Sequence, residues 1–181
     1  MKFILEFLLL FSIQSADSIG LEIVAGGLRS PFCDVVFETM SKSVESEPIL
    51  FCSLLYWSFK DPFDAGSMRS YTLGLGTTSL LVQSLKYVTN RDRPDGFYTT
   101  RSNSSFPSGH ASVAFYVASY YSAMHPTYSL PLYLWASGVS LSRVYLRTHW
   151  PTDVIFGALV GYTSGKLFYK FRNKFQDLTI F

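Results

Sequence analysis

The chain has little charge, little cysteine and no internal repeat or low-complexity run. Only 15% of its 181 residues are charged, against roughly 25% in an average soluble domain, while 48% are hydrophobic. This composition excludes a disordered chain. Lys and Arg total 15 and Asp and Glu total 13, so a net charge of +2 predicts no nucleic-acid partner.

Cysteine is equally scarce. Cys33 and Cys52 are the only two, too few for a disulfide scaffold or for a zinc site built on cysteine. They form one bridge in an oxidising compartment, or they are two small buried residues, and the sequence fits both interpretations.

Charge is absent altogether from residues 102–142, which contain no Asp, Glu, Lys or Arg. The mean hydropathy of +0.20 is high for a soluble protein and low for one that crosses a bilayer many times. Because the apolar segments are short and contain Ser, Thr, Tyr and Gly, they favour core helices of an exported bundle that rests on the membrane surface. Location in the cell envelope is therefore expected, with an integral membrane protein as the alternative.

The N-terminus has the parts of a secretory leader. Lys2 precedes an apolar run over 3–13, broken by Glu6, and a small and polar stretch follows over 14–18. The run is shorter than the roughly 20 residues of a spanning helix. We expect residues 1–16 to be a signal peptide and 17–181 to be one domain. The alternative is an amphipathic first helix that stays on the protein, and it is kept open by Glu6 and by an imperfect cleavage site, in which Ala16 is small but Gln14 is not.

The remaining patterns predict helices. Residues 17–47 are expected to form short helices and turns, and 49–59 a short apolar helix. Leucines and a valine mark one face of a helix over 69–88, namely Leu73, Leu80, Leu81, Leu85 and Val88. His125-Pro126 and Pro131 separate two helices of about 15 residues, and a last helix begins at Pro151 and runs to about Lys170. No segment alternates like a strand, so the fold class is all-α, a bundle of about six helices.

Three clusters of polar residues interrupt this apolar chain. In the first, Lys86 and Arg93 are seven residues apart, which places them on one helix face about 10 Å apart along the axis. Their long side chains can converge on one anion, and Pro94 ends the helix. Taken alone, they also fit a pair of solvated cations at a helix C-terminus.

In the second cluster, Pro107, Ser108, Gly109 and His110 directly precede an apolar helix. A helix start offers free N–H groups and a hydroxyl to a phosphate, and Gly109 lets the backbone approach it. His110 then lies beside the anion, where it can protonate a leaving oxygen. An ordinary serine cap fits this segment equally well.

In the third cluster, Ser142 and Arg143 precede His149 by several residues, and Asp153 follows four positions later. Pro151 starts a helix just after His149, which puts Asp153 in its first turn. We expect Asp153 to bind one imidazole nitrogen of His149 and to leave the other free for nucleophilic attack. An isolated His-x-x-x-Asp pair is weak evidence by itself.

Together the three clusters resemble the signature of the type 2 phosphatidic acid phosphatase and haloperoxidase superfamily. Its pattern is Lys-x6-Arg-Pro, then Pro-Ser-Gly-His, then Ser-Arg-x5-His-x3-Asp, and all eleven fixed positions match in order. The resemblance covers Lys86 to Asp153 and, with flanking helices, most of the chain after Arg69. His125 matches nothing in the pattern and is interpreted as a turn residue.

The resemblance implies a metal-independent phosphatase that forms a phosphohistidine and needs no cofactor. His149 is implied as the nucleophile, Asp153 as its orienting partner and His110 as the general acid. The implied phosphate-binding residues are Lys86, Arg93, Ser108, Gly109 and Arg143. Three cations and a helix N-terminus suit a phosphoryl group in transfer, whose negative charge spreads over its oxygens.

The sequence does not identify which phosphate ester is the substrate. The superfamily includes membrane phosphatases of lipids such as phosphatidate or isoprenyl diphosphate, soluble exported acid phosphatases, and haloperoxidases, which are much longer chains. Aromatic residues near the clusters fit either an entrance for a lipid tail or core packing. A non-catalytic phosphate-binding envelope protein is the alternative of another class, and the retained His110 and His149 argue against it.

Overall fold

A computed structural model describes residues 2–45, 65–96 and 100–175. Six α-helices occur in these ranges: α1 (Lys2–Leu21), α2 (Pro31–Lys42), α4 (Ala65–Thr89), α5 (Gly109–Met124), α6 (Ser129–Tyr145) and α7 (Pro151–Lys170). These ranges contain no strand, which confirms the predicted all-α bundle. The helix predicted over 49–59 lies outside the described residues.

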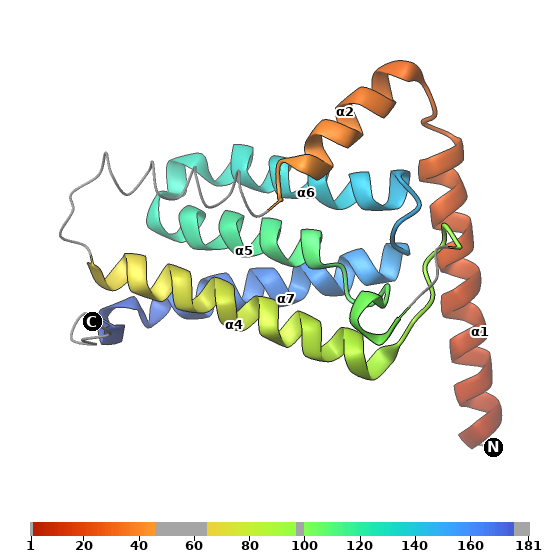
Figure 1. The fold of residues 1–181 in the computed structure, drawn as a ribbon, viewed down its shortest axis with the longest axis horizontal. Coiled ribbons are helices and arrows are strands. Elements are labelled where there is room, and N and C mark those ends of the chain that lie inside the picture. The colour runs from red at the N-terminus through yellow and green to blue at the C-terminus, as the bar shows by residue number, and fades with distance from the viewer. Residues whose placement is uncertain (1, 46–64, 97–99, 176–181) are drawn as a thin grey trace.

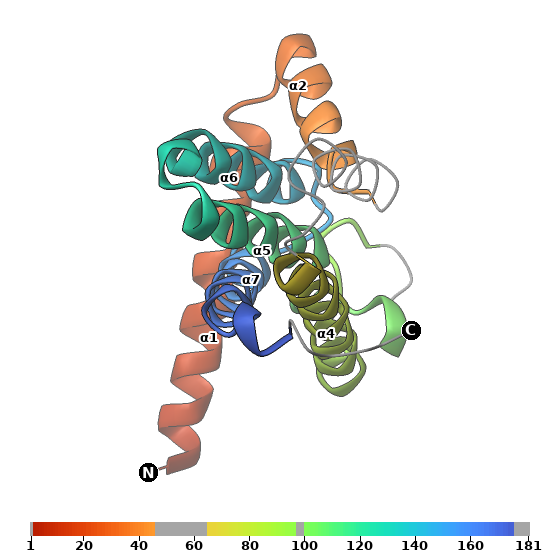
Figure 2. The same cartoon turned by 90° about the vertical axis from the view of Figure 1, so that its left-hand side faces the viewer.

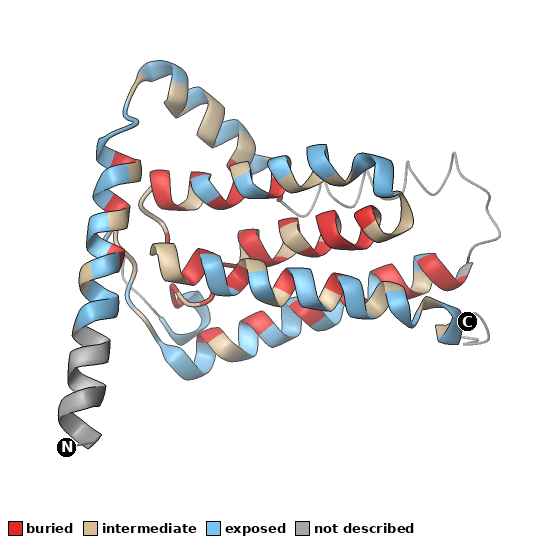
Figure 3. Cartoon of the chain, turned by 180° about the vertical axis from the view of Figure 1, so that it is seen from behind, coloured by how far each residue is buried: buried red, intermediate tan, exposed pale blue. Residues whose placement is uncertain are grey.

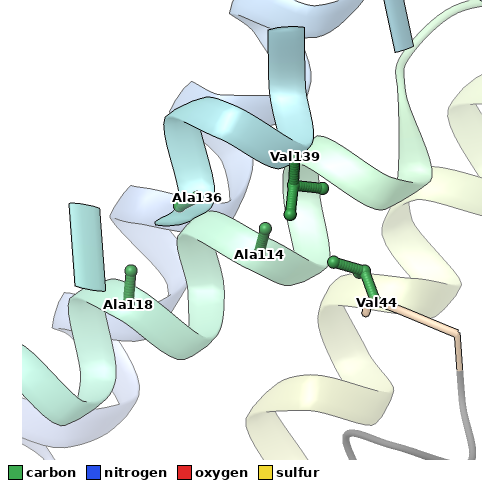
Figure 4. Packing of buried hydrophobic residues seen from close by; sticks show 5 residues of the cluster. All are labelled: Val44, Ala114, Ala118, Ala136 and Val139. Carbon is green, nitrogen blue, oxygen red and sulfur yellow. The ribbon is translucent and has the colours of Figure 1, made fainter. Parts of the chain in front are cut away.

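Helices α4 to α7 lie alongside one another, and α5 packs against the other three (Figure 1). Helix α2 packs on α6, while α1 runs across one end of the bundle (Figure 2). Buried residues follow α5 along most of its length (Figure 3), which makes it the central helix. One apolar cluster joins α5, α6 and the segment after α2 (Figure 4): Val44, Ala114, Ala118, Ala136 and Val139.

Glycine allows α5 and α7 to approach closely. Gly157, Gly161 and Gly165 are spaced by four residues on α7 and are buried. A Cβ on Gly157 would lie 2.5 Å from the carbonyl oxygen of Ser108, and one on Gly161 would overlap the Ser112 carbonyl. Small residues at this spacing let two helix backbones pack in direct contact. The start of α5 is thereby held against α7.

Helix α4 is confirmed, but its leucine face points outward. Leu80 is 71% exposed and Val88 is 81% exposed. The buried stripe is instead Tyr71, Gly74, Thr78, Val82 and Lys86, at helical spacing. Tyrosines fasten this stripe to α5: the Tyr116 hydroxyl donates to the Tyr71 carbonyl at 2.8 Å, and Tyr120 donates to the Ser67 carbonyl at 2.7 Å.

The predicted breaks are correct at His125-Pro126 and at Pro151, but Pro131 interrupts nothing. Pro131 lies in the first turn of α6, where its missing N–H has no intrahelical partner to lose. The segment between α5 and α6 is thus only residues 125–128. Helix α7 begins at Pro151 and ends at Lys170, as predicted.

The N-terminal segment forms the single helix α1 through Leu21. Asp17, one residue beyond the predicted leader, is 1% exposed within it. Cleavage after about residue 16 stays a prediction. None of the helices within residues 2–45, 65–96 and 100–175 has both the length and the apolar character of a membrane span.

Candidate active site

Four helix ends bring the three clusters together. Lys86 lies in the last turn of α4, Ser108 caps the start of α5, and Arg143 lies in the last turn of α6. His149 comes just before α7, and Asp153 lies in its first turn. All four ends meet at the end of the bundle that α1 crosses (Figure 1). Antiparallel packing therefore gathers residues that are up to 67 positions apart in the sequence.

His149 is 2% exposed and is oriented by a backbone carbonyl. Its Nδ1 lies 2.7 Å from the Ser105 carbonyl oxygen, whereas the nearest oxygen of Asp153 is 3.7 Å away. The hydrogen bond expected between Asp153 and one imidazole nitrogen is therefore not formed at Nδ1, which binds Ser105 instead. Because a carbonyl only accepts, Nδ1 carries the proton and Nε2 has a free lone pair.

The His149 ring is neutral at physiological pH. Burial, together with the charges of Lys86, Arg93 and Arg143, lowers its pKa to about 4, although the neighbouring Asp153 opposes this shift. A neutral imidazole with a free Nε2 is the form needed for nucleophilic attack.

Asp153 is fully buried and holds the surroundings of His149. Its Oδ2 accepts from the Ser105 hydroxyl and from the Trp150 N–H at 2.8 Å, and its Oδ1 lies 2.5 Å from Arg91. Burial would raise the pKa of this carboxyl, but the His149 ring, the Ser105 hydroxyl and the Arg91 charge together lower it. Asp153 is therefore ionised, and it positions Ser105, which in turn orients His149.

Three cations surround the two histidines. Lys86 is 8% exposed, and its Nζ donates to the Ser104 carbonyl at 2.5 Å. Burial and then the charge of Arg93 lower the pKa of Lys86 to about 8. Arg93 donates to the Thr148 carbonyl at 2.9 Å and to Asn103 at 2.8 Å. Its guanidinium is thus fixed before any anion arrives.

One donor of Arg143 has no hydrogen-bond partner among the described residues and can bind a ligand. Its Nη1 donates to the Ser41 hydroxyl of α2, while its buried Nε has no hydrogen-bond partner among the described residues. Burial and then the charge of Arg93 lower its pKa to about 10, so it remains protonated at neutral pH. A buried donor without a partner is costly unless a ligand satisfies it.

The start of α5 is held in place from two sides. The Ser108 N–H donates to the Asp153 carbonyl at 3.0 Å, and its side chain caps the Ala111 N–H. A cavity of about 190 Å³ between α4 and α5 is lined in part by Lys86 and Gly109. This arrangement suits the binding of phosphate oxygens at a helix N-terminus.

The His110 ring is neutral at physiological pH. Burial lowers its pKa most, and the charges of Arg143, Arg93 and Lys86 and the neighbouring His149 ring add to this, to a value of about 3. A bound phosphate would offset these positive charges and raise the pKa. If His110 is the general acid, it must therefore take up its proton when the anion binds.

Several neighbours of the site were not singled out from the sequence. Ser105 and Arg91 contact His149 or Asp153 directly, while Asp17 and Ser41 reach the site from α1 and α2. Arg91 stands two positions before Arg93, but no spacing rule pairs it with Asp17, 74 residues away. His125 caps the end of α5, remote from the signature, in agreement with a turn residue. The described residues contain no group of three or more His, Cys, Asp and Glu that could hold a metal ion.

The family described as the PAP2 superfamily matches residues 68–177, which include all eleven signature positions. The chain belongs to the PAP2 superfamily. This confirms the resemblance drawn from the three clusters.

Two curated PAP2 relatives are named for lipid phosphatase activity. The chain is 39% identical over 104 residues to the lipid A 1-phosphatase of Porphyromonas gingivalis, covering 55% of this chain and 22% of that protein. It is 34% identical over 95 residues to the lipid A 4'-phosphatase of Bacteroides thetaiotaomicron, covering 51% of this chain and 39% of that protein. The chain thus matches less than half the length of either relative.

Two solved structures share the fold over nearly their whole length. Aquifex aeolicus LpxE superposes with a TM-score of 0.71 at 25% identity, covering 83% of this chain and 92% of that one. The transmembrane PAP2 type phosphatidylglycerolphosphate phosphatase from Bacillus subtilis also gives 0.71 at 25% identity, covering 92% and 89%. The predicted bundle is therefore a PAP2 fold.

Proposed function

We propose that the chain is a phosphatase that hydrolyses phosphate monoesters of lipids through a phosphohistidine on His149. The observation that supports this most is the state of His149, which is buried and neutral and whose Nδ1–H donates to the Ser105 carbonyl. The charges of Lys86, Arg93 and Arg143 act on this ring, and the same three cations can neutralise a phosphate. Family membership supports the same chemistry.

In the first step, Nε2 of His149 attacks phosphorus, and a P–N bond forms as the P–O bond to the alcohol breaks. His110 donates its proton to the departing oxygen. Lys86, Arg93 and Arg143, with Ser108 and the Gly109 N–H, hold the other phosphate oxygens as charge develops on them.

In the second step, His110 removes a proton from water, and the hydroxide oxygen attacks phosphorus as the P–N bond breaks. Inorganic phosphate leaves, and both histidines return to their starting states. The cations carry the neutralisation that a metal provides in other phosphatases, so we propose that no metal ion is required.

A lipid substrate is supported by the relatives' names and by the outer surface. Both curated relatives are named lipid A phosphatases. Large apolar side chains are exposed on α4, α6 and α7, among them Leu80, Val88, Leu130, Leu134, Ile155 and Leu159. Apolar patches of this kind mark surfaces that meet a membrane or another protein. Both observations support our proposal that the chain acts at the membrane of the cell envelope.

The experiment is phosphate release from detergent micelles by the purified full chain. Lipid A, phosphatidylglycerophosphate, phosphatidate, isoprenyl diphosphate and a soluble monoester form the substrate panel, and His149→Gln is the control. We expect release from at least one lipid, none from the control, and no effect of EDTA. Activity confined to the soluble monoester would favour a non-specific acid phosphatase, and loss in EDTA restored by Mg²⁺ or Zn²⁺ would contradict the mechanism.

The predicted leader is tested on the native protein. Residues 1–16, if removed on export, would leave a mature chain that begins near Asp17. N-terminal sequencing of the protein from the membrane fraction distinguishes this from a retained α1, for which Met1 or Lys2 is found.

A further inference from the structure

One arginine outside the signature links the N-terminal helix to the active site. The guanidinium of Arg91 lies 2.5 Å from Oδ2 of Asp17 on α1 and 2.5 Å from Oδ1 of Asp153 on α7. Asp17 is 1% exposed and Asp153 is fully buried. Thr152 completes the network, because its N–H and hydroxyl donate to Asp17 at 2.9 and 2.6 Å. Two buried carboxylates therefore share one cation.

The backbone of Arg91 holds the same neighbourhood from the other side. Its N–H donates to the Ser104 hydroxyl at 2.8 Å, and its carbonyl accepts from the Ser105 N–H at 2.8 Å. Ser105 carries the carbonyl that orients His149, and its hydroxyl donates to Asp153. Arg91 thus binds Asp153 and Ser105, and the part of the chain that the structure describes shows no hydrogen bond between Arg91 and the His149 ring.

We propose that Arg91 is a positioning residue for catalysis, anchored by Asp17, that keeps Asp153 and Ser105 in the arrangement that orients His149. The inference rests on the proposed phosphatase function and assigns α1 a part in it. Rotation of Asp153 would release the Ser105 hydroxyl and with it the carbonyl at Nδ1. Because reacting atoms must be held within fractions of an ångström, a small displacement there lowers kcat.

The positive charge of Arg91 supports the role of His149 as well, in addition to the contacts that Arg91 makes. It lowers the pKa of Asp153, and without it the carboxylate is less neutralised and acts more strongly on His149. The pKa of His149 should therefore rise when Arg91 loses its charge. The groups that face these two residues are Arg91, Trp150 and Ser105 at Asp153, and Lys86, Arg93, Arg143 and His110 at His149.

The same end of the fold offers a matched control. Arg147 binds Glu22 at 2.8 and 2.9 Å, and so also joins the N-terminal region to the segment between α6 and α7. Neither residue of this exposed pair contacts Ser105 or Asp153 in any hydrogen bond that the described residues show. Glu22→Gln therefore removes an ion pair at the same end of the fold, an exposed one, without disturbing the support of His149.

The experiment compares kcat, KM and the pH profile for the full chain and four variants: Arg91→Gln, Arg91→Lys, Asp17→Asn and Glu22→Gln. Arg91→Gln should lower kcat about 10–100-fold, as the loss of outer supporting contacts does in other sites, with KM changed less than about threefold. The acidic limb of the kcat profile should move to higher pH. Arg91→Lys should recover part of kcat, Asp17→Asn should lose part of it, and Glu22→Gln should match the wild type.

Two results would overturn the inference. One is a wild-type kcat and acidic limb in Arg91→Gln, with only the unfolding temperature lowered, which indicates a purely structural ion pair. The other is an unchanged His149 pKa in Arg91→Gln, measured by NMR of the imidazole nitrogens. Should Arg91→Gln fail to fold, Asp17→Asn carries the same comparison. A wild-type chain without activity on any phosphate ester contradicts the proposed function, and the His149 pKa still tests the link.

Discussion

Nδ1 of His149 lies 2.7 Å from the carbonyl oxygen of Ser105, while Asp153 is 3.7 Å from the same nitrogen. The tautomer of the proposed nucleophile is thus set by the backbone, and the carboxylate acts one step away, through the Ser105 hydroxyl. Ser105 therefore sets the tautomer of His149, and Asp153 supplies the negative charge beside it. A direct His–Asp hydrogen bond would combine these two roles in one residue.

Replacement of His149 should therefore lower kcat more than replacement of Asp153. His149→Ala should abolish turnover, and rapid quench with a labelled substrate should trap acid-labile phosphate on the wild type only. Asp153→Asn should lower kcat by about 10²–10³-fold, less than the roughly 10⁴-fold seen where a wrong tautomer results. Nitrogen NMR should find His149 still protonated on Nδ1 in this variant. Label on the alanine variant, or a switch of the proton to Nε2, would contradict the assignment.

His110→Ala should reveal whether this residue is the general acid. The loss should be about 10²–10⁴-fold with an alkyl phosphate and much smaller with a nitrophenyl phosphate, whose leaving group needs no proton. Equal losses would indicate that His110 only binds phosphate.

Proton uptake tests the same residue without turnover. Because the pKa of His110 is about 3, its ring is neutral at pH 6. Vanadate neutralises the surrounding cations and should raise this pKa, so binding should be accompanied by proton uptake. Calorimetry in buffers of different ionisation enthalpy measures it, and His110→Gln should abolish it. A wild-type value of zero would argue that the substrate itself must carry the proton.

Lys86 should produce an alkaline limit. Its pKa is lowered to about 8, so its positive charge is present below that pH and is lost above it. We expect kcat/KM to fall as the pH rises through about 8, because the site then binds a phosphate with one cation fewer. In Lys86→Arg the guanidinium stays charged, and the limb should move to higher pH. A limb that stays near pH 8 in this variant would assign it to another group.

The close contact of α5 with α7 should be sensitive to a single methyl group. Gly161→Ala places a Cβ onto the Ser112 carbonyl and should reduce the free energy of unfolding by about 1–3 kcal/mol. Gly76→Ala on α4 is the control, since nothing lies within 4 Å of its Cβ, and it should be neutral or stabilising by up to about 1 kcal/mol. Denaturant unfolding of both variants in one detergent measures this free energy. Equal free energies of unfolding would refute the packing argument.

The sequence by itself predicted the helices with strong local signals. Pro151 marks the start of α7 because proline fits the first helical turn, and His125-Pro126 ends α5 because proline cannot continue a helix. The leucine periodicity located α4 but did not indicate which face is buried. Only tertiary packing decided that the stripe through Thr78 and Lys86 faces α5 and α7, because the same period is produced by a buried or an exposed apolar face.

The residues of the signature were also readable in the sequence, since eleven fixed positions in order leave little to chance. The contacts that hold these residues in place could not be predicted from the sequence. Ser105 acts through a carbonyl that every residue possesses, so no residue type could announce its contact with His149. Arg91 and Asp17 are 74 positions apart, and their pairing exists only because α1 crosses the end of the bundle where α7 begins. Chemistry carried by residue type is visible in a sequence, whereas contacts made by the backbone or across helices are decided when the chain folds.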